Sequence, residues 1–258
     1  MPTALINGIN VFYEDHGGEV PILLSHGYSA TGRMWAPQAK ALAPRYRLIT
    51  WDMRGHGQTD SPDSLDQYSE ELTVADMRGL LEHLGIREAV VGGLSMGGYM
   101  SLAFYLRHPQ MVRALVLSDT GPGYRKAEAR EAWNRMAEAR AKAFEEQGLD
   151  ALGSGAEVRA SALYHRSARG LALSARGMLA QSGSRVIDAL PGIRVPALVL
   201  VGEHDEPFLP ATDYMAAKIP GARKVVIEGA GHAANIERAD AFNAALLGFL
   251  DSLGLRNG

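Results

Sequence analysis

Residues 89–98 read Ala-Val-Val-Gly-Gly-Leu-Ser-Met-Gly-Gly. The apolar first half predicts a buried strand, and a helix is predicted from Met96 to about Arg107, before Pro109. Ser95 therefore falls on a sharp turn between a strand and a helix. The flanking glycines let the strand and the helix approach each other without clashes between Cβ atoms. This Gly-x-Ser-x-Gly spacing, in this setting, predicts that Ser95 is a nucleophile.

Five further apolar runs resemble strands that are covered on both faces, because they do not alternate with polar residues. They are Ile22–Ser25, Arg47–Trp51, Ala114–Ser118, Ala197–Val201 and Arg223–Ile227. Parallel strands need crossover helices, and helical patterns separate most of these runs. One such helix has Ser69 as its cap and Gly85 as its stop. The chain is therefore predicted to form an α/β fold with a doubly wound, mostly parallel sheet.

The region from about Pro122 to Val186 contains no strand-like run. An apolar helical stripe consists of Ala129, Trp133, Met136 and Phe144. Further helical segments are expected around Val158–Arg166 and Leu171–Leu179. We expect residues 122–186 to be a helical cap over the carboxyl edge of the sheet, and residues 1–121 and 187–258 to be the core of one structural domain. Extra crossover helices on one face of the sheet are the alternative.

Composition narrows the classes of protein. The chain has 258 residues, a net charge of −3 and no cysteine, which excludes disulfides, zinc–thiolate sites, iron–sulfur clusters and cysteine nucleophiles. The near-neutral net charge does not indicate the basic surface that proteins use to bind nucleic acid. No apolar run approaches the roughly 18 residues of a membrane helix, and the first residues lack a signal-peptide pattern. We expect a cytoplasmic protein without nucleic-acid or membrane partners; its oligomeric state is not predicted.

A serine nucleophile needs a base, because serine alone is a weak nucleophile. His232 is the best candidate among the eight histidines, since it follows the last predicted strand in a glycine-rich loop on the same edge as Ser95. Asp205 follows the strand that ends at Val201 and could orient the imidazole. The chain order of serine, aspartate and histidine is the one that accompanies this serine turn. Asp119 also ends a strand and is a rival acid, although a turn-forming role explains it too.

Acyl transfer also needs donors for an oxyanion. The N–H group of Met96, directly after the nucleophile, is the first candidate. The second lies in the loop after an earlier strand, where His26-Gly27-Tyr28 makes the Tyr28 N–H the candidate donor.

Three patterns that could suggest a cofactor or metal are better explained otherwise. The glycines of residues 229–234 match a dinucleotide-binding pattern, but only one helix remains after them. Residues 203–206 contain acidic groups and a histidine without a second histidine-rich segment. No Gly-Lys-Ser/Thr triplet occurs, so a phosphate-binding P-loop is excluded. No cofactor and no metal are predicted.

The motifs together resemble those of the α/β-hydrolase superfamily over nearly the whole chain. They are His26-Gly27-Tyr28, Trp51–Gly57, the Ser95 turn, Val201–Asp205 and the His232 loop. Thr59 stands where the family often has a serine. Within the superfamily the chain is similar to small carboxylesterases, enol-lactonases, acyl-homoserine-lactone hydrolases and the carbon–carbon bond hydrolases of aromatic breakdown. The serine nucleophile limits its likeness to haloalkane dehalogenases and epoxide hydrolases to the fold.

The resemblance implies an α/β-hydrolase fold with a helical lid at residues 122–186. The residues predict a cofactor-free serine hydrolase that cleaves a small carboxylic ester or lactone through an acyl-enzyme, with Ser95, His232 and Asp205 as its triad. We expect at least one of Trp133, Met136 and Phe144 to roof the pocket. A carbon–carbon bond hydrolase and a non-catalytic ligand receptor on the same fold remain the alternatives.

Overall fold

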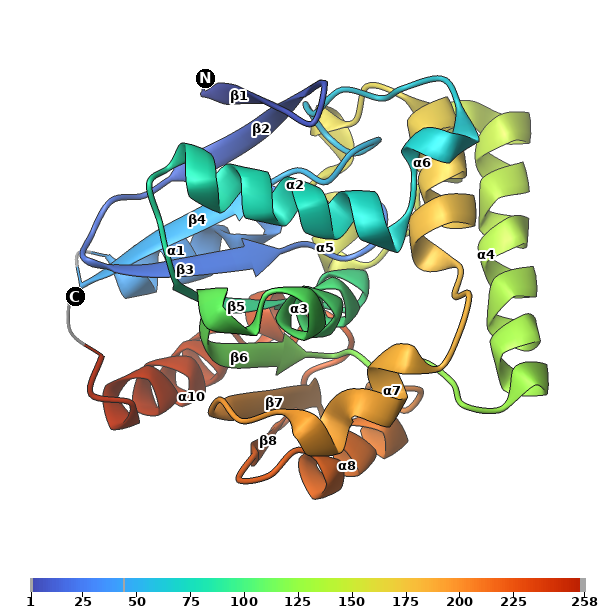
Figure 1. The fold of residues 1–258 in the computed structure, drawn as a ribbon. Coiled ribbons are helices and arrows are strands. Elements are labelled where there is room, and N and C mark those ends of the chain that lie inside the picture. The colour runs from blue at the N-terminus through green and yellow to red at the C-terminus, as the bar shows by residue number, and fades with distance from the viewer. Residues whose placement is uncertain (1, 44, 256–258) are drawn as a thin grey trace.

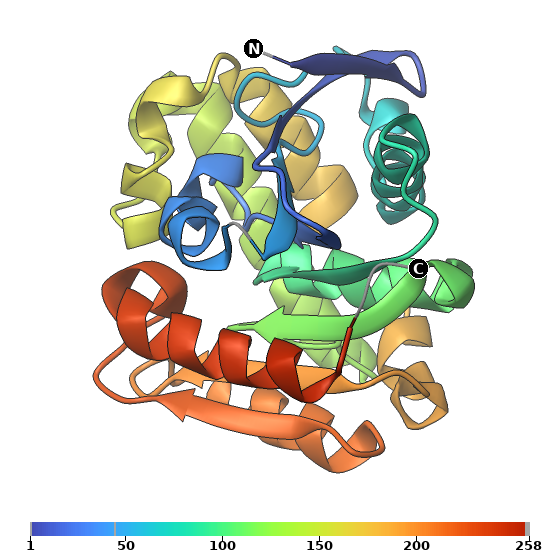
Figure 2. The same cartoon turned by 90° about the vertical axis from the view of Figure 1, so that its left-hand side faces the viewer.

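An eight-stranded sheet runs through the centre of the protein in a computed structural model that describes residues 2–43 and 45–255. The strand order is β1-β2-β4-β3-β5-β6-β7-β8, with β1 and β8 at opposite edges (Figure 2). The strands are β1 (Thr3–Ile6), β2 (Ile9–Asp15), β3 (Val20–Ser25), β4 (Tyr46–Trp51), β5 (Ala89–Leu94), β6 (Val112–Ser118), β7 (Ala197–Gly202) and β8 (Arg223–Ile227). Strands β4, β3, β5, β6, β7 and β8 pair in parallel. The predicted mostly parallel α/β sheet is confirmed.

Helices cover both faces of this sheet (Figure 1). The α-helices are α1 (Ala36–Leu42), α2 (Glu70–His83), α3 (Met96–Arg107), α4 (Ala127–Gln147), α5 (Ala156–Arg159), α6 (Ala168–Ser174), α7 (Arg185–Ala189), α8 (Leu209–Lys218), α9 (Ala234–Glu237) and α10 (Ala239–Ser252). Side chains of α2, α3 and α8 pack in one core cluster, and side chains of α1 and α10 pack in the other. Strands β3, β4, β5, β6 and β7 each divide their apolar residues between the two clusters, which explains their unbroken apolar sequences. The expectation that Arg223–Ile227 is covered on both faces is wrong, because β8 lies at the edge of the sheet and its Val226 is exposed.

The first two strands form an antiparallel hairpin at one edge of the sheet. Residues of β1 alternate between exposed and buried, as expected of a strand with one face in water. Strand β2 joins the hairpin to β4, also antiparallel. The apolar-run pattern did not predict these two strands, because only every second residue of β1 is buried and the continuous apolar run of β2 is limited to Val11, Phe12 and Tyr13.

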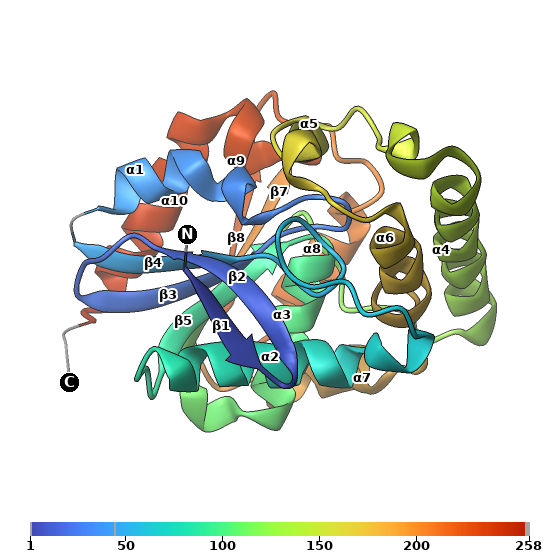
Figure 3. The ribbon, with the colours of Figure 1, turned by 90° about the horizontal axis from the view of Figure 1, so that it is seen from above.

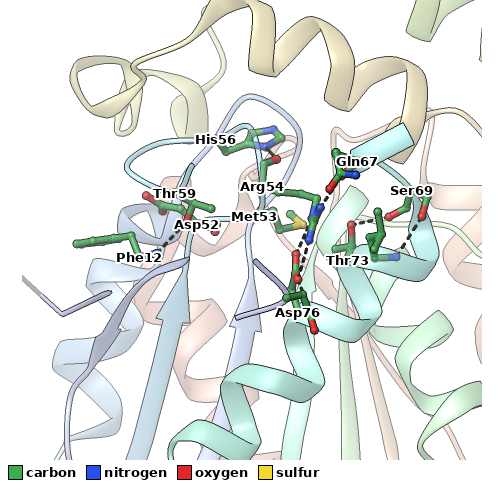
Figure 4. A network of polar contacts seen from close by, with 12 residues as sticks. Phe12, Asp52, Met53, Arg54, His56, Thr59, Gln67, Ser69, Thr73 and Asp76 are labelled. Atoms are coloured by element: carbon green, nitrogen blue, oxygen red, sulfur yellow. Dashed lines mark hydrogen bonds and ion pairs between the residues drawn. The ribbon is translucent and has the colours of Figure 1, made fainter. Parts of the chain in front are cut away.

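The loop after β4 is held by a buried polar network (Figure 4). The Arg54 guanidinium donates to both carboxylate oxygens of Asp76, at 2.7 and 2.8 Å, and both side chains are fully buried. Thr59 Oγ1 accepts a hydrogen bond from the Phe12 N–H at 2.8 Å and donates to the Asp52 carbonyl at 2.6 Å. A threonine hydroxyl makes both bonds as well as a serine hydroxyl could. These contacts fix the loop after β4, whose Met53 N–H donates at 2.9 Å to Nε2 of His26, directly after β3.

Residues 122–186 contain helices and no strand among the described residues. Helices α4 and α6 lie side by side beyond the arrowheads of the parallel strands (Figures 1 and 3). The expected helical segment around Val158–Arg166 is interrupted: α5 ends at Arg159, and a 3₁₀ turn covers Ala162–Tyr164. The segment around Leu171–Leu179 continues from α6 into a π-helical turn, η6 (Ala175–Leu179). The division into core and cap stays a prediction.

Candidate active site

Ser95 lies on a strained turn between β5 and α3. Its backbone has φ 54° and ψ −118°, a combination that is unfavourable for a residue with a side chain. Neighbouring segments hold it there. The Ser95 N–H donates to the Ser118 carbonyl at 3.0 Å, and Thr120 Oγ1 donates to the Ser95 carbonyl at 2.6 Å. The side chain is half-buried and projects from the carboxyl edge of the sheet.

The glycines around Ser95 are required by close backbone packing. A Cβ atom on Gly97 would lie 2.3 Å from the Ser25 carbonyl oxygen, and one on Gly93 would lie 2.5 Å from the carbonyl carbon of Gly97. Both obstacles are backbone atoms, so no side-chain movement could relieve the clash. The turn thus brings the start of α3 against the end of β3.

His232 and Asp205 are brought together at the same edge. The distance from His232 Nδ1 to Asp205 Oδ2 is 2.8 Å. Asp205 is 5% exposed and is held by its N–H, which donates to the Gly202 carbonyl at 3.1 Å. Because Nδ1 carries a proton when it donates to the carboxylate, the neutral ring has its lone pair on Nε2. This arrangement leaves Nε2 free to act as a base.

The surroundings of His232 favour its charged form. Burial opposes the imidazolium, but the hydrogen bond and the charge of Asp205, with smaller contributions from Asp119 and Glu157, raise the pKa of His232. The ring also stacks on Phe208, with centroids 5.0 Å apart and planes at 28°. Phe208 was not predicted as a site residue, and its position in the sequence carries no motif that could have indicated it.

Asp119 lies in the same region but is bonded elsewhere. Its Oδ1 accepts from the Gly202 N–H at 2.8 Å, and its Oδ2 accepts from Ser118 Oγ at 2.6 Å. Burial raises the pKa of the Asp119 carboxyl to about 7. The structure therefore pairs His232 with Asp205 by a hydrogen bond and gives both oxygens of Asp119 other partners.

Met96 and Tyr28, whose N–H groups are the predicted oxyanion donors, each line a cavity that Ser95 also lines. Met96 is the first residue of α3, where backbone N–H groups have no partner within the helix. Tyr28 follows β3 and lines the same cavity as Ser95 and His232. Its phenol donates to the Leu171 carbonyl at 2.9 Å, and burial raises the pKa of this phenol.

Two cavities meet at Ser95. The smaller, about 280 Å³, is here called the apolar cavity; it contains no charged side chain, and its wall includes Met96, Tyr99, Tyr124, Ile187 and Tyr214. The larger, about 430 Å³, is here called the polar cavity; its wall includes Tyr28, Arg140, Glu157, Asp205 and His232. Ser95, Trp133 and Phe208 line both cavities.

The apolar stripe of α4 divides between two roles. Trp133 lines both cavities, and Met136 lines the polar cavity. Phe144 is 3% exposed and packs edge-on against the Tyr28 ring, with centroids 6.2 Å apart. Trp133 and Met136 thus face the space above Ser95, whereas Phe144 attaches α4 to the molecule.

Sequence reasoning also missed His165, which the structure places against the loop after β3. The ring is 7% exposed and lies 2.9 Å from the Ser29 carbonyl through Nε2. No motif in the sequence indicates that a single histidine of the helical insertion contacts the loop after β3.

Within residues 2–43 and 45–255, no three or more His, Cys, Asp or Glu side chains are grouped so that they could hold a metal ion. In the same part of the chain no helix is both long and apolar enough to cross a membrane.

Residues 20–181 match the family model described as alpha/beta hydrolase fold, and the chain belongs to this family. An esterase from Thermogutta terrifontis shares 29% identity and a TM-score of 0.82, with 98% of each chain covered. The enol-lactonase from Burkholderia xenovorans LB400 shares 31% identity and a TM-score of 0.79, over 97% of this chain and 100% of that chain. A non-heme haloperoxidase from Rhodococcus erythropolis is 28% identical over 272 residues, which cover 95% of this chain and 97% of the relative.

Proposed function

We propose that the protein is a serine hydrolase that cleaves a small carboxylic ester or lactone through an acyl-enzyme. The observation that carries the proposal is the 2.8 Å contact between His232 and Asp205, on the wall of a cavity that Ser95 also lines. The similarity to an esterase and to an enol-lactonase supports the same class of reaction.

In the proposed reaction His232 Nε2 takes the proton of Ser95 Oγ as the oxygen attacks the substrate carbonyl carbon. Asp205 keeps the proton on Nδ1 and stabilises the imidazolium. The carbonyl π electrons move to oxygen, and the N–H groups of Tyr28 and Met96 stabilise the resulting oxyanion. His232 then gives its proton to the leaving alcohol oxygen. Water, activated by the same histidine, hydrolyses the acyl-enzyme.

The positions of the two cavities support an orientation for the substrate. The leaving oxygen must lie within reach of His232, which lines the polar cavity and not the apolar one. We therefore assign the alcohol portion and the incoming water to the polar cavity. The acyl portion is assigned to the apolar cavity, whose aromatic and aliphatic walls suit an apolar group.

We also propose that residues 122–186 act as a cap that excludes water from the reacting groups. Trp133 supports this role because it lines both cavities and is fixed by its indole N–H, which donates to the Leu179 carbonyl at 2.8 Å. A water-excluding roof would strengthen the electrostatic interactions on which the oxyanion depends.

The test compares wild-type enzyme with Ser95→Ala on p-nitrophenyl esters, lactones and a dienoate substrate of carbon–carbon bond hydrolases. Ester turnover should fall by up to about a millionfold without a change in the melting temperature. A fluorophosphonate should label the wild type at Ser95 and leave Ser95→Ala unlabelled. Ser64→Ala is the matched control, because Ser64 is exposed and makes no capping hydrogen bond. Wild-type ester turnover in Ser95→Ala would refute the proposal, and faster turnover of the dienoate than of every ester would favour carbon–carbon bond cleavage.

A further inference from the structure

Residues 28–31, hereafter the oxyanion loop, are held by the helical insertion at three places. The hydrogen bonds are Tyr28 Oη to the Leu171 carbonyl (2.9 Å), His165 Nε2 to the Ser29 carbonyl (2.9 Å) and the Thr31 N–H to Ser161 Oγ (2.9 Å). All three partners lie between residues 161 and 171. The insertion is therefore in contact with the main chain that carries a proposed oxyanion donor.

His165 is the central contact, and its protonation follows from its neighbours. The Gly57 N–H donates to Nδ1 at 3.1 Å, so this nitrogen is the acceptor and Nε2 carries the proton that is donated to Ser29. Burial lowers the pKa of His165, which favours the neutral ring that these two bonds require. The imidazole thus joins the insertion to two separate loops of the sheet.

The peptide group between Gly27 and Tyr28 contains the Tyr28 N–H, and hydrogen bonds to its carbonyl oxygen fix its orientation. The Gly27 carbonyl lies 2.7 Å from His26 Nδ1 and accepts from the Ala30 N–H at 3.2 Å. The Met53 N–H donates to His26 Nε2 at 2.9 Å, so His26 Nδ1 carries the proton. In a planar trans peptide the C=O and the N–H point in opposite directions. The Tyr28 N–H therefore points away from His26.

Ser29 has an unfavourable backbone conformation within the oxyanion loop. Its φ of 56° is unfavourable for a residue other than glycine, so the loop needs an external contact to keep this conformation. We propose that His165 is a positioning residue of the reaction, because its bond to the Ser29 carbonyl keeps the Tyr28 N–H aimed at the oxyanion. The inference rests on the proposed function, since it takes the Tyr28 N–H as an oxyanion donor.

Two substitutions separate the two bonds of His165. His165→Gln can place an amide N–H where Nε2 lies and so retain the bond to Ser29. His165→Asn can place an amide oxygen where Nδ1 lies and so retain only the bond to Gly57. We expect His165→Asn to lower kcat by about tenfold to a hundredfold, less than the 10²–10³-fold loss of an entire oxyanion donor, with KM changed by less than about twofold. His165→Gln should remain within about threefold of the wild-type kcat.

A second measurement reports on the oxyanion directly. Ser95 Oγ attacks the carbonyl carbon of a trifluoromethyl ketone, and the serine proton passes to His232. The resulting adduct carries an oxyanion but has no leaving group. Its affinity should fall in His165→Asn by the same factor as kcat/KM. Ser184→Ala is the matched control: it removes an exposed hydrogen bond of the insertion, from Ser184 Oγ to Asp188 Oδ2 at 2.7 Å, outside residues 161–171. It should leave kcat and the affinity for the ketone unchanged.

Three outcomes would overturn the proposal: wild-type kcat in His165→Asn, equal losses in the Asn and Gln variants, or a loss confined to KM. If His165→Asn does not fold, Tyr28→Phe removes the neighbouring contact to Leu171 and should give the same kcat-specific loss; a wild-type kcat would then contradict the role of the insertion. Ser95→Ala, measured in parallel, separates the two hypotheses. Activity that survives in Ser95→Ala refutes the proposed function, whereas unchanged His165 variants with an inactive Ser95→Ala refute only this inference.

Discussion

Replacing Asp205 by asparagine is the most informative test of which carboxylate serves His232. The side chain keeps its shape, but its amide can present an N–H to His232 Nδ1 in place of the carboxylate oxygen that lies 2.8 Å away. The ring would then keep its proton on Nε2, where the base is needed. The same change in a serine protease lowers kcat by about 10⁴-fold, which corresponds to about 5 kcal/mol of transition-state stabilisation. We expect a loss of this order.

Asp119→Asn is the matched control. Both oxygens of Asp119 bond to groups other than His232, namely the Gly202 N–H and Ser118 Oγ. An asparagine can accept from Gly202 through its oxygen, and the Ser118 hydroxyl can turn to accept from the new amide. We therefore expect a loss of about tenfold or less, as for removal of a group outside the hydrogen-bonded triad.

The pH profile provides a second assay for the same pair. The reaction needs neutral His232, so kcat/KM must fall as the pH drops through its pKa, which Asp205 and, to a smaller degree, Asp119 raise. Removing either charge should move the midpoint of this acid limb to lower pH, and Asp205→Asn should move it further. A larger loss of kcat in Asp119→Asn than in Asp205→Asn would refute the assignment and place the acid at the end of β6.

Three further variants test the packing around the site. Trp133→Ala should change the ratio of kcat/KM between short and long acyl esters by about 1–3 kcal/mol, because Trp133 lines the apolar cavity; an unchanged acyl-length profile would contradict its role as a roof. Phe144→Ala should leave that ratio alone and lower the free energy of unfolding, measured in urea, by about 3–5 kcal/mol. Asp76→Asn should also destabilise by about 3–5 kcal/mol, because it leaves the fully buried Arg54 without its carboxylate; a loss below 1 kcal/mol would show that the loop after β4 does not need the pair.

The central strands and the serine turn could be predicted because local sequence determines them. The runs Ala114–Ser118 and Ala197–Val201 are apolar at successive positions, which is the pattern of a strand that is buried on both faces. The glycines beside Ser95 are visible in the sequence because backbone packing leaves no room for a Cβ atom. By contrast, β1 (Thr3–Ile6) and β2 (Ile9–Asp15) form an antiparallel edge of the sheet. Exposed and buried residues alternate in β1, so a search for strands that are buried on both faces does not find it.

The contacts between the insertion and the sheet could not be predicted in the same way. Trp133 and Phe144 share one apolar stripe of a long helix, and the stripe alone cannot distinguish the cavity wall from the packed interior. His165 meets Ser29 across 136 residues of sequence, a pairing that depends on where the whole insertion lies. The spacing of motifs along the sequence can identify groups at the ends of neighbouring strands. It does not predict where a helix of the insertion lies above the carboxyl edge of the sheet.

Backbone strain is concentrated at the proposed site. Among the described residues, the non-glycine residues with positive φ are Asn7, Ser29, Ser95 and Asp119. The last three follow β3, β5 and β6, which are neighbours in the sheet. Such conformations cost of order 1–3 kcal/mol each and persist only where surrounding structure imposes them. Here each is bonded to a different segment: Ser29 to the insertion, Ser95 to the end of β6, and Asp119 to β7. A sheet edge that needed only stability would not require three adjacent strained turns, whereas an edge that must aim a hydroxyl and a backbone N–H at one carbonyl group would.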